Sequence, residues 1–480
     1  MSYRKFVDFE VRGWLPIALL VFGVIAQAQN MPTPEVGAQT PNQPAPAFGQ
    51  ETPPQQATEN PPLSGLDEPV FEPGSDVKNY IQPGLAVSES LDTNAAGDFS
   101  NAKVRSVTRV LGSLAVQRIW SRFDAGLDYV GGAGIYTHGL GTRQVHSLDS
   151  FGRTFWRNGH LTLRNNFSYL PEGTFGFGSY GGVGGFPFGG AIGGGGVGGF
   201  GGALHFFGVG QLGTLGNEPH LTNLSTIDIA QHLTPRSSVT FTAGYGIGHF
   251  TDDTQNLVDS RQTAAQVGYN YVLSRKDQIG LIYGYQHFQF PGGGNTFNTH
   301  LGHIMYGRAI TGRMSFVIAA GPQVTELRDP VFGNTNRLTG SGRASLHYRF
   351  PKTTFAFVYS RYNTTGSGFF AGAESDIIRF NVTRALGRKY EGFADVGYSR
   401  NKRLQDSFLG VNAAHFNSIY AGTGVHRQLT RELRLFLTYQ FAEVSFDDAL
   451  CAGDPSCSHS GQRHVVTVGL GWRPRPVRLD

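Results

Sequence analysis

The chain has 480 residues, of which 67 are Gly, 12 % are aromatic and only 15 % are charged. Soluble globular domains carry about 25 % charged residues and about half this share of Gly, so the composition excludes an ordinary helical bundle. A net charge of +4 lacks the strongly basic footprint of a nucleic-acid-binding protein. After the first thirty positions no apolar run reaches the roughly 18 residues of a membrane-spanning helix, although strands of about ten alternating residues can also cross a membrane.

The N-terminus has the layout of a secretory signal peptide. Basic residues precede an apolar segment over 14–25, and the small residues Ala26 and Ala28 follow it. This order predicts a signal peptide over 1–28 that is removed after Ala28.

Residues 29–78 are predicted to form a disordered Pro-rich linker. Eleven of the 24 Pro fall between positions 31 and 74, among Gln, Thr, Ala and Glu. Such a segment has too few apolar side chains to form a core. It is either a passive tether or a docking segment for a partner.

From position 81 to position 472 the sequence alternates with a period of two. A clear case has Val239, Phe241, Ala243, Tyr245 and Ile247 on one face, with Ser, Thr or Gly between them. A period of two with one apolar and one small or polar face predicts strands between two unlike environments.

Tight turns and longer loops separate these segments in strict alternation. The tight turns lie at 121–122, 158–159, 235–236, 276–277, 312–313, 351–352, 387–388 and 430–431. The predicted strands are 81–91, 104–119, 122–136, 143–156, 159–170, 220–233, 237–250, 261–274, 277–290, 297–310, 313–327, 336–350, 353–364, 373–386, 389–400, 414–428, 432–446 and 462–473.

This count of about eighteen strands, with sixteen as the alternative, is even, and an antiparallel barrel can close on it. A β-propeller also repeats near forty residues, but each blade needs four short strands. The repeat here holds two strands that are long enough for a tilted membrane crossing. The pattern therefore favours the barrel.

The last predicted strand resembles the closing strand of bacterial outer-membrane β-barrels, which the barrel-assembly machinery recognises. Its apolar face is Val466, Val468, Leu470 and Trp472, with Gly469 and Gly471 between them. Together with the signal peptide and the hairpins, these residues make the chain porin-like.

The resemblance implies an all-β protein with a single transmembrane antiparallel up-and-down β-barrel over 79–473. It places the barrel in the bacterial outer membrane in contact with lipids. The linker, the tight turns, both termini and a tail over 474–480 are then periplasmic, and a homo-oligomer is left open.

Aromatic and basic residues gather at the tight turns. Trp120 and Trp156 directly precede tight turns and Trp472 ends the last strand, so all three lie at one end, as a periplasmic aromatic girdle would require. Every tight turn also has Arg or Lys in it or beside it, which predicts a cationic rim near anionic headgroups.

The third long loop, 171–219, is the candidate constriction. Between 173 and 216 it has 21 Gly and no charged residue, and its aromatic residues include Phe175, Phe177, Tyr180, Phe186 and Phe188. In porins, which the chain resembles, the third outer loop folds into the channel. An apolar eyelet would favour neutral or amphiphilic solutes, whereas a loose surface loop or an adhesive patch is the alternative.

Charges interleaved with the apolar stripe are the candidate pore-lining residues. They are Asp124, Asp128, Asp228, Arg343, Arg349, Arg379 and Arg434. The third and twelfth strands lie opposite each other in a ring of eighteen, so acidic and basic walls would set up a transverse field. The alternative is an ordinary wet lumen with mixed charges.

Residues 176–181 match the Gly-x-Gly-x-x-Gly dinucleotide pattern by letters, but they lack the following helix and the acidic partner, so composition explains them. The common hydrolase and metalloprotease motifs are not found, and we expect no enzyme, no cofactor and no metal. Cys451 and Cys457 are predicted to form a small structural disulfide in an oxidising compartment.

These features favour a channel for passive diffusion of small solutes, narrowed or gated by the third loop. Two alternatives are the barrel component of a polysaccharide-export or surface-assembly system, and a surface adhesin.

Overall fold

One antiparallel sheet makes up most of the described chain in the computed structural model. The structure describes residues 79–97, 102–137, 139, 141–170, 219–251, 257–291, 296–311, 313–329, 333–387, 389–404, 413–447 and 458–479. The predicted signal peptide over 1–28 and the whole predicted linker over 29–78 lie outside these ranges. No helix in the described ranges is both long and apolar enough to cross a membrane.

The strands follow one another at the spacing predicted from the alternation. The first nine are β1 (Tyr80–Asp92), β2 (Arg105–Ile119), β3 (Phe123–Tyr136), β4 (Gly141–Trp156), β5 (Gly159–Leu170), β6 (His220–Thr234), β7 (Ser237–Phe250), β8 (Ser260–Val272) and β9 (Asp277–Gln289). The others are β10 (Thr296–Thr311), β11 (Met314–Asp329), β12 (Gly333–Arg349), β13 (Thr353–Thr364), β14 (Ala373–Ala385), β15 (Tyr390–Arg403), β16 (His415–Gln428), β17 (Leu433–Phe446), β18 (Ser460–Trp472) and β19 (Val477–Arg478). A 3₁₀ turn, η3 (Gly366–Gly368), lies between β13 and β14.

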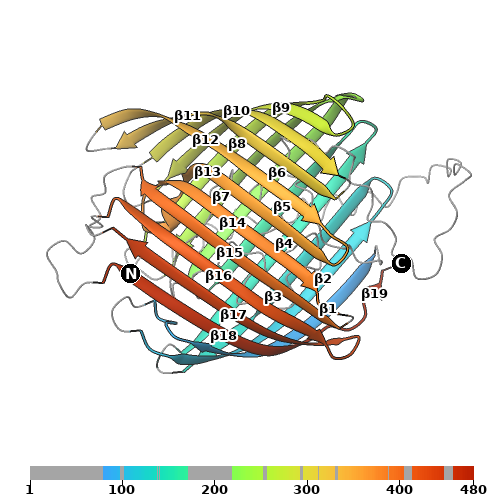
Figure 1. Cartoon of the computed structure of the whole chain (residues 1–480), viewed down its shortest axis with the longest axis vertical. Coiled ribbons are helices and arrows are strands. Elements are labelled where there is room, and N and C mark those ends of the chain that lie inside the picture. Colours follow the sequence, from blue (N-terminus) through green and yellow to red (C-terminus); the bar gives the residue numbers. More distant parts are fainter. Residues whose placement is uncertain are drawn as a thin grey trace, which may run out of the picture. The chain divides into compact units, whose positions relative to one another are not determined.

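Strands β1 to β18 form a closed ring. Each pairs antiparallel with the next along the chain, and β18 pairs with β1 over eight residues, from Leu85↔Trp472 to Asp92↔Val465. Figure 1 shows the blue β1 beside the red β18 and the oblique course of the strands. The predicted barrel of eighteen strands is thus confirmed, and no predicted boundary is more than three residues from the observed one. The sixteen-strand count and the propeller are excluded.

The two faces of the barrel wall have opposite polarity. On β17 Leu437 is 55 % exposed on the outward face, whereas its neighbour Thr438 is 2 % exposed on the inward face. Outward Leu, Ile, Val, Tyr and Phe side chains repeat this pattern around the ring, and inward positions carry Ser, Thr, Gln, Gly and charged residues. Such a continuous apolar exterior is unfavourable in water, and alternation of this kind is the pattern of strands that span a bilayer.

We call the two ends of the barrel the tight-turn end and the long-loop end. Near the long-loop end, a buried ion pair joins the first strand to the last. Arg463 of β18 donates from Nε to both carboxylate oxygens of Asp92 on β1, each at 3.0 Å, and Nη2 also donates to Asp92. Both side chains are 0 % exposed. Fork-shaped pairing of this kind fixes geometry as well as charge.

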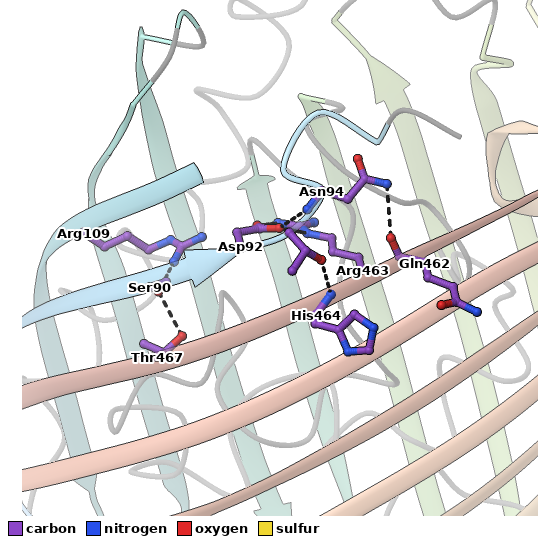
Figure 2. A network of polar contacts seen from close by, with 9 residues as sticks. Ser90, Asp92, Asn94, Arg109, Gln462, Arg463, His464 and Thr467 are labelled. Atoms are coloured by element: carbon purple, nitrogen blue, oxygen red, sulfur yellow. Dashed lines mark hydrogen bonds and ion pairs between the residues drawn. The ribbon is translucent and has the colours of Figure 1, made fainter. Parts of the chain in front are cut away.

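Neighbouring polar contacts extend this seam, as Figure 2 shows. Ser90 of β1 hydrogen-bonds Thr467 of β18 at 2.9 Å and accepts from Arg109 of β2 at 2.8 Å. Beyond the strands, Asn94 Nδ2 donates to the carbonyl of Gln462 at 3.2 Å. The inward side of the closing seam is therefore held by side chains as well as by the backbone.

The tight-turn end of the seam is completed by β19. Val477 and Arg478 pair with Ile81 and Tyr80 of β1, and Gln82 Nε2 donates to the carbonyl of Pro474 at 2.7 Å. The segment predicted as a tail over 474–480 thus continues the pairing of the last strand along β1.

Candidate functional site: the interior of the barrel

The tip of the β13–β14 hairpin leaves the barrel wall and enters the interior. β12 continues to Gly333, but its pairing with β13 stops at Gly342↔Arg361. β13 and β14 stay paired with each other up to Thr364↔Ala373. Residues 362–372, which include η3, therefore have no wall strand on the β12 side, and their side chains contact the inner faces of other strands.

Asn363 anchors the tip to two wall strands, β10 and β11, which lie beyond β12 in the ring. Its Nδ2 amide donates to Thr299 Oγ1 of β10 at 2.9 Å and to Thr325 Oγ1 of β11 at 2.7 Å. Both threonines are buried on the inward face. They occupy odd-numbered positions of β10 and β11, whereas the outward residues Ile304 and Val324 occupy even-numbered positions. One buried amide thus ties the tip across two wall strands.

Ion pairs hold the base of the same hairpin. Glu374 Oε1 accepts from Arg361 Nη2 at 2.5 Å, and Arg337 of β12 places its Nη2 3.8 Å from Glu374 Oε2. Arg361 also lies 3.5 Å from Asp376. The Glu374 side chain is only 5 % exposed, so this contact replaces the missing backbone pairing between β12 and the hairpin.

Three glycines allow the tip to turn inward. Gly366, Gly368 and Gly372 have φ of 78°, 83° and 95°, which non-glycine residues rarely adopt. A Cβ on Gly368 would lie 2.5 Å from the ring of Phe250, and one on Gly372 would lie 2.4 Å from the ring of Phe297. The backbone of the tip is also hydrogen-bonded to neighbouring segments of the chain.

Two backbone hydrogen bonds reach the tip from neighbouring segments. Val258 N donates to the Gly368 carbonyl at 2.8 Å, and Leu404 N donates to the Gly372 carbonyl at 3.2 Å. These donors come from the segments before β8 and after β15, so the tip is bonded to chain on two sides.

Aromatic rings pack around the inserted tip. The ring centroid of Phe370 lies 5.3 Å from that of Phe416 of β16. The ring centroids of Phe369 and Phe446 of β17 are 5.1 Å apart in an edge-to-face arrangement. On the other side a second cluster contains Val258, Phe288, Phe290, Phe297, Leu327 and Leu404, with Ala371 against it. Edge-to-face and offset ring pairs of this kind add to the free energy of burial. The inserted tip and these rings therefore form an apolar cluster at the long-loop end of the interior.

This apolar cluster is a feature that sequence reasoning missed. The predicted strands 353–364 and 373–386 leave 365–372 as a loop to which no role is assigned, although its sequence, Thr-Gly-Ser-Gly-Phe-Phe-Ala-Gly, has the Gly and Phe content that drew attention to the third loop. The third loop, with Phe175, Phe177, Tyr180, Phe186 and Phe188, lies outside the described residues. So do Cys451 and Cys457.

Strand register places the predicted pore-lining charges on the inward face. Those whose side chains the structure describes are Asp124, Asp128, Asp228, Arg343, Arg379 and Arg434. Arg349 is a residue of β12, and its side chain is not among those described. Asp228 is 1 % exposed and accepts from Thr242 Oγ1 at 2.7 Å, so it is held within the wall.

Further inward charges were not singled out from the sequence. Asp149 of β4 lies directly opposite Asp128 of β3 and accepts from Asn166. Inward cations on the neighbouring strands are Arg109, Arg153, Arg164 and Arg463. Among the described residues, no three His, Cys, Asp or Glu side chains converge as a metal site would require.

Trp120, Trp156 and Trp472 each lie at the tight-turn end of the barrel, after β2, on β4 and on β18, and are exposed. Trp156 Nε1 donates to Gln231 Oε1 at 2.8 Å, and the guanidinium of Arg118 lies 5.0 Å from the ring of Trp120. Trp472 ends β18. A position at a membrane interface suits rings with one polar contact, and this role stays a prediction.

No protein-family model matches the chain, and no curated protein matches it either. Among solved structures, the outer membrane protein opdK from Pseudomonas aeruginosa has a TM-score of 0.41 at 9 % identity, covering 82 % of this chain and 98 % of that one. OpdQ from the same organism has a TM-score of 0.41 at 10 % identity, with 83 % and 99 % covered. OprD has a TM-score of 0.39 at 9 % identity, with 85 % and 99 % covered.

These similarities are weak, and the fold rests on the strand pairing of the chain itself. The closed ring of eighteen antiparallel strands, apolar outside and polar inside, is the fold of a porin-like outer-membrane β-barrel.

Proposed function

We propose that this protein is an outer-membrane channel through which small solutes diffuse passively. The observation that supports it most is the closed eighteen-strand ring with a polar inner face. A ring of this size encloses more space than its own side chains can fill, and such barrels contain an aqueous path. The apolar exterior would then contact lipid hydrocarbon, with both chain termini on the periplasmic side.

In this proposal the β13–β14 tip narrows the channel at its long-loop end. The tip is packed against the aromatic clusters formed with strands β7, β9, β10, β16 and β17. Inward arginines lie on β2, β4, β5 and β18, away from those clusters, and also on β12, β14 and β17. We infer that solutes pass between the tip and the wall formed by β18 and β2 to β5. A contribution of the loop 171–219 to the constriction remains part of the proposal.

Conductance in planar bilayers tests the proposal. Purified, folded protein is expected to give discrete openings with an ohmic current. Protein that folds into vesicles and gives no openings, both as the full chain and without residues 173–216, would contradict the channel.

The inward charges also predict the preferred ion. In the described strands inward Arg residues outnumber inward Asp residues, and a lumen lined by one sign of charge concentrates ions of the other sign. We expect the reversal potential in a salt gradient to show anion preference. Arg434→Gln combined with Arg379→Gln should reduce this preference, and a cation-selective wild type would show that the described wall does not set selectivity.

A further inference from the structure

The outward face of the β9–β10 hairpin changes character along its length. Toward the tight-turn end it carries Ile279, Leu281 and Ile304, of which Ile304 is 70 % exposed. Toward the long-loop end the outward positions are Tyr283, Tyr285, His287 and Gln289 on β9, and Asn298 and His300 on β10. We call these six residues the outward polar ladder. The ladder therefore lies at the edge of the apolar band on the outer face of the barrel.

Hydrogen bonds connect the ladder along the hairpin. Tyr283 Oη and His300 Nδ1 are 2.7 Å apart. Asn298 Oδ1 accepts from Tyr285 Oη at 3.1 Å and lies 2.6 Å from His287 Nδ1. Because a carbonyl oxygen only accepts, His287 donates here from Nδ1.

The hydrogen-bond pattern leaves donors for a ligand. His287 Nε2 then accepts from Gln289 Nε2, which is 2.9 Å away. Since Asn298 uses its oxygen for both internal contacts, its Nδ2 amide remains as a donor pointing away from them. The second N–H of Gln289 is likewise directed away from His287. Amide N–H donors of this kind suit an anionic oxygen.

Two arginines flank the ladder on the neighbouring strands. Arg261 of β8 is the register partner of Gln289, and Arg328 of β11 is the register partner of Thr296, at the same end and on the same face. Two carboxylates lie at the same end: Glu326 of β11 is opposite Asn298, and Asp259 precedes Arg261 by two residues. Asp259 already accepts from His249 Nδ1 at 2.6 Å and from Phe250 N at 2.8 Å, so both of its oxygens have partners apart from the two guanidinium groups. Guanidinium groups bind phosphate through paired N–H donors.

We propose that the outward polar ladder and its two flanking arginines seat the net-anionic, phosphate-bearing headgroup of a lipid in the leaflet at the long-loop end. This inference rests on the membrane placement given under Proposed function. The tyrosine rings would lie at the edge of the hydrocarbon, where amphipathic rings are favoured. The amides and guanidinium groups above them would contact the phosphate, and the acyl chains would lie along Leu281 and Ile304.

Lipid retention by the folded full-length chain tests this proposal. The protein is purified in mixed micelles that contain equal amounts of phosphatidic acid and phosphatidylcholine, and retained lipids are counted by native mass spectrometry. Wild type is expected to retain phosphatidic acid in preference to phosphatidylcholine. Arg261→Gln combined with Arg328→Gln should weaken this retention by about tenfold or more, since each cation near a surface contributes on the order of 1 kcal/mol.

The matched control removes two other outward cations at the same end. Arg400 and Lys402 of β15 are exposed and lie beside the Tyr398–Asn417 hydrogen bond, but their register partners on β14 are the carboxylates Asp376 and Glu374, so Arg400→Gln combined with Lys402→Gln should leave retention unchanged. Equal loss in both double variants, or no loss in the first, would overturn the proposal. Displacement by excess inorganic phosphate would assign the site to free phosphate and also overturn it.

The same samples separate this proposal from the channel. If the variants and wild type conduct equally in bilayers but no lipid preference is found, the lipid seat fails and the channel stands. If wild type gives no openings, the channel fails whatever lipid is retained.

Discussion

Replacing Asp92 by Ala is expected to destabilise the folded barrel by about 3–5 kcal/mol, because removing one partner of a buried ion pair leaves the other charge without its counter-charge in a poorly solvated place. Arg463 is 0 % exposed and donates through two nitrogens to this one carboxylate. The pair also joins strands at the two ends of the barrel sequence, so its loss acts where the ring closes. The result should be seen as a lower denaturant midpoint in vesicles and as a lower temperature for loss of the compact band on electrophoresis.

Two controls show whether the ion pair itself is responsible. Asp92→Leu combined with Arg463→Met replaces both charges by apolar groups, and this exchange of a buried pair is often neutral. The double variant should therefore be more stable than Asp92→Leu alone or Arg463→Met alone. Arg434→Gln, at an exposed inward position, should change stability by no more than about 0.5 kcal/mol. Single variants as stable as wild type would show that the backbone pairing of β1 and β18 closes the ring unaided.

Substituting Gly368 and Gly372 by Ala is expected to expel the β13–β14 tip from the lumen and to raise the single-channel conductance. Each residue has a left-handed conformation, which costs a side-chain-bearing residue about 1–2 kcal/mol. Each added Cβ would also lie within 2.5 Å of a phenylalanine ring carbon. Since about 1.4 kcal/mol changes an equilibrium tenfold, the two changes together should shift the tip from mostly inserted to mostly displaced.

The matched control for this experiment is Gly340→Ala combined with Gly302→Ala. Neither residue has a heavy atom within 4 Å of an added Cβ, and neither has positive φ. This variant should conduct as wild type does. Asn363→Ala, which removes the anchor to Thr299 and Thr325, should give frequent transitions between the wild-type and the larger conductance. Unchanged conductance in the Gly368 and Gly372 variant would mean that the tip does not limit the current.

The wall of the barrel could be predicted from sequence because its signal is local. Each strand meets water on one side and hydrocarbon on the other, so residues such as Leu437 and Thr438 alternate within a few positions. The tight turns repeat at every second connection, and this fixed the strand boundaries closely. Inward charges such as Asp124 and Arg343 followed from the same parity.

The contacts inside the barrel could not be predicted in the same way, because they join residues that are far apart in the sequence. Asp92 and Arg463 are 371 positions apart, and neither carries a local sign of the other. The alternation of β13 also continues unbroken through Tyr359 and Arg361, so nothing in it marks where the hairpin leaves the wall. The inserted tip is anchored by Thr299 of β10 and Thr325 of β11, which lie beyond the intervening strand β12 and accept from Asn363.

The central claim is that one face of each strand meets a conducting lumen and the other meets lipid. Cysteine labelling on the two opposite faces of β17 tests this claim most directly, in a background with Cys451 and Cys457 replaced by Ser. Cysteine at Arg434, on the inward face, should react with a membrane-impermeant sulfonate reagent. The single-channel current should then fall, because the reaction adds a negatively charged group to a neutral thiol in an anion-preferring lumen. Cysteine at Leu437, on the outward face, should leave the current unchanged under the same treatment. Equal responses at both positions, or a change only at Leu437, would contradict the account.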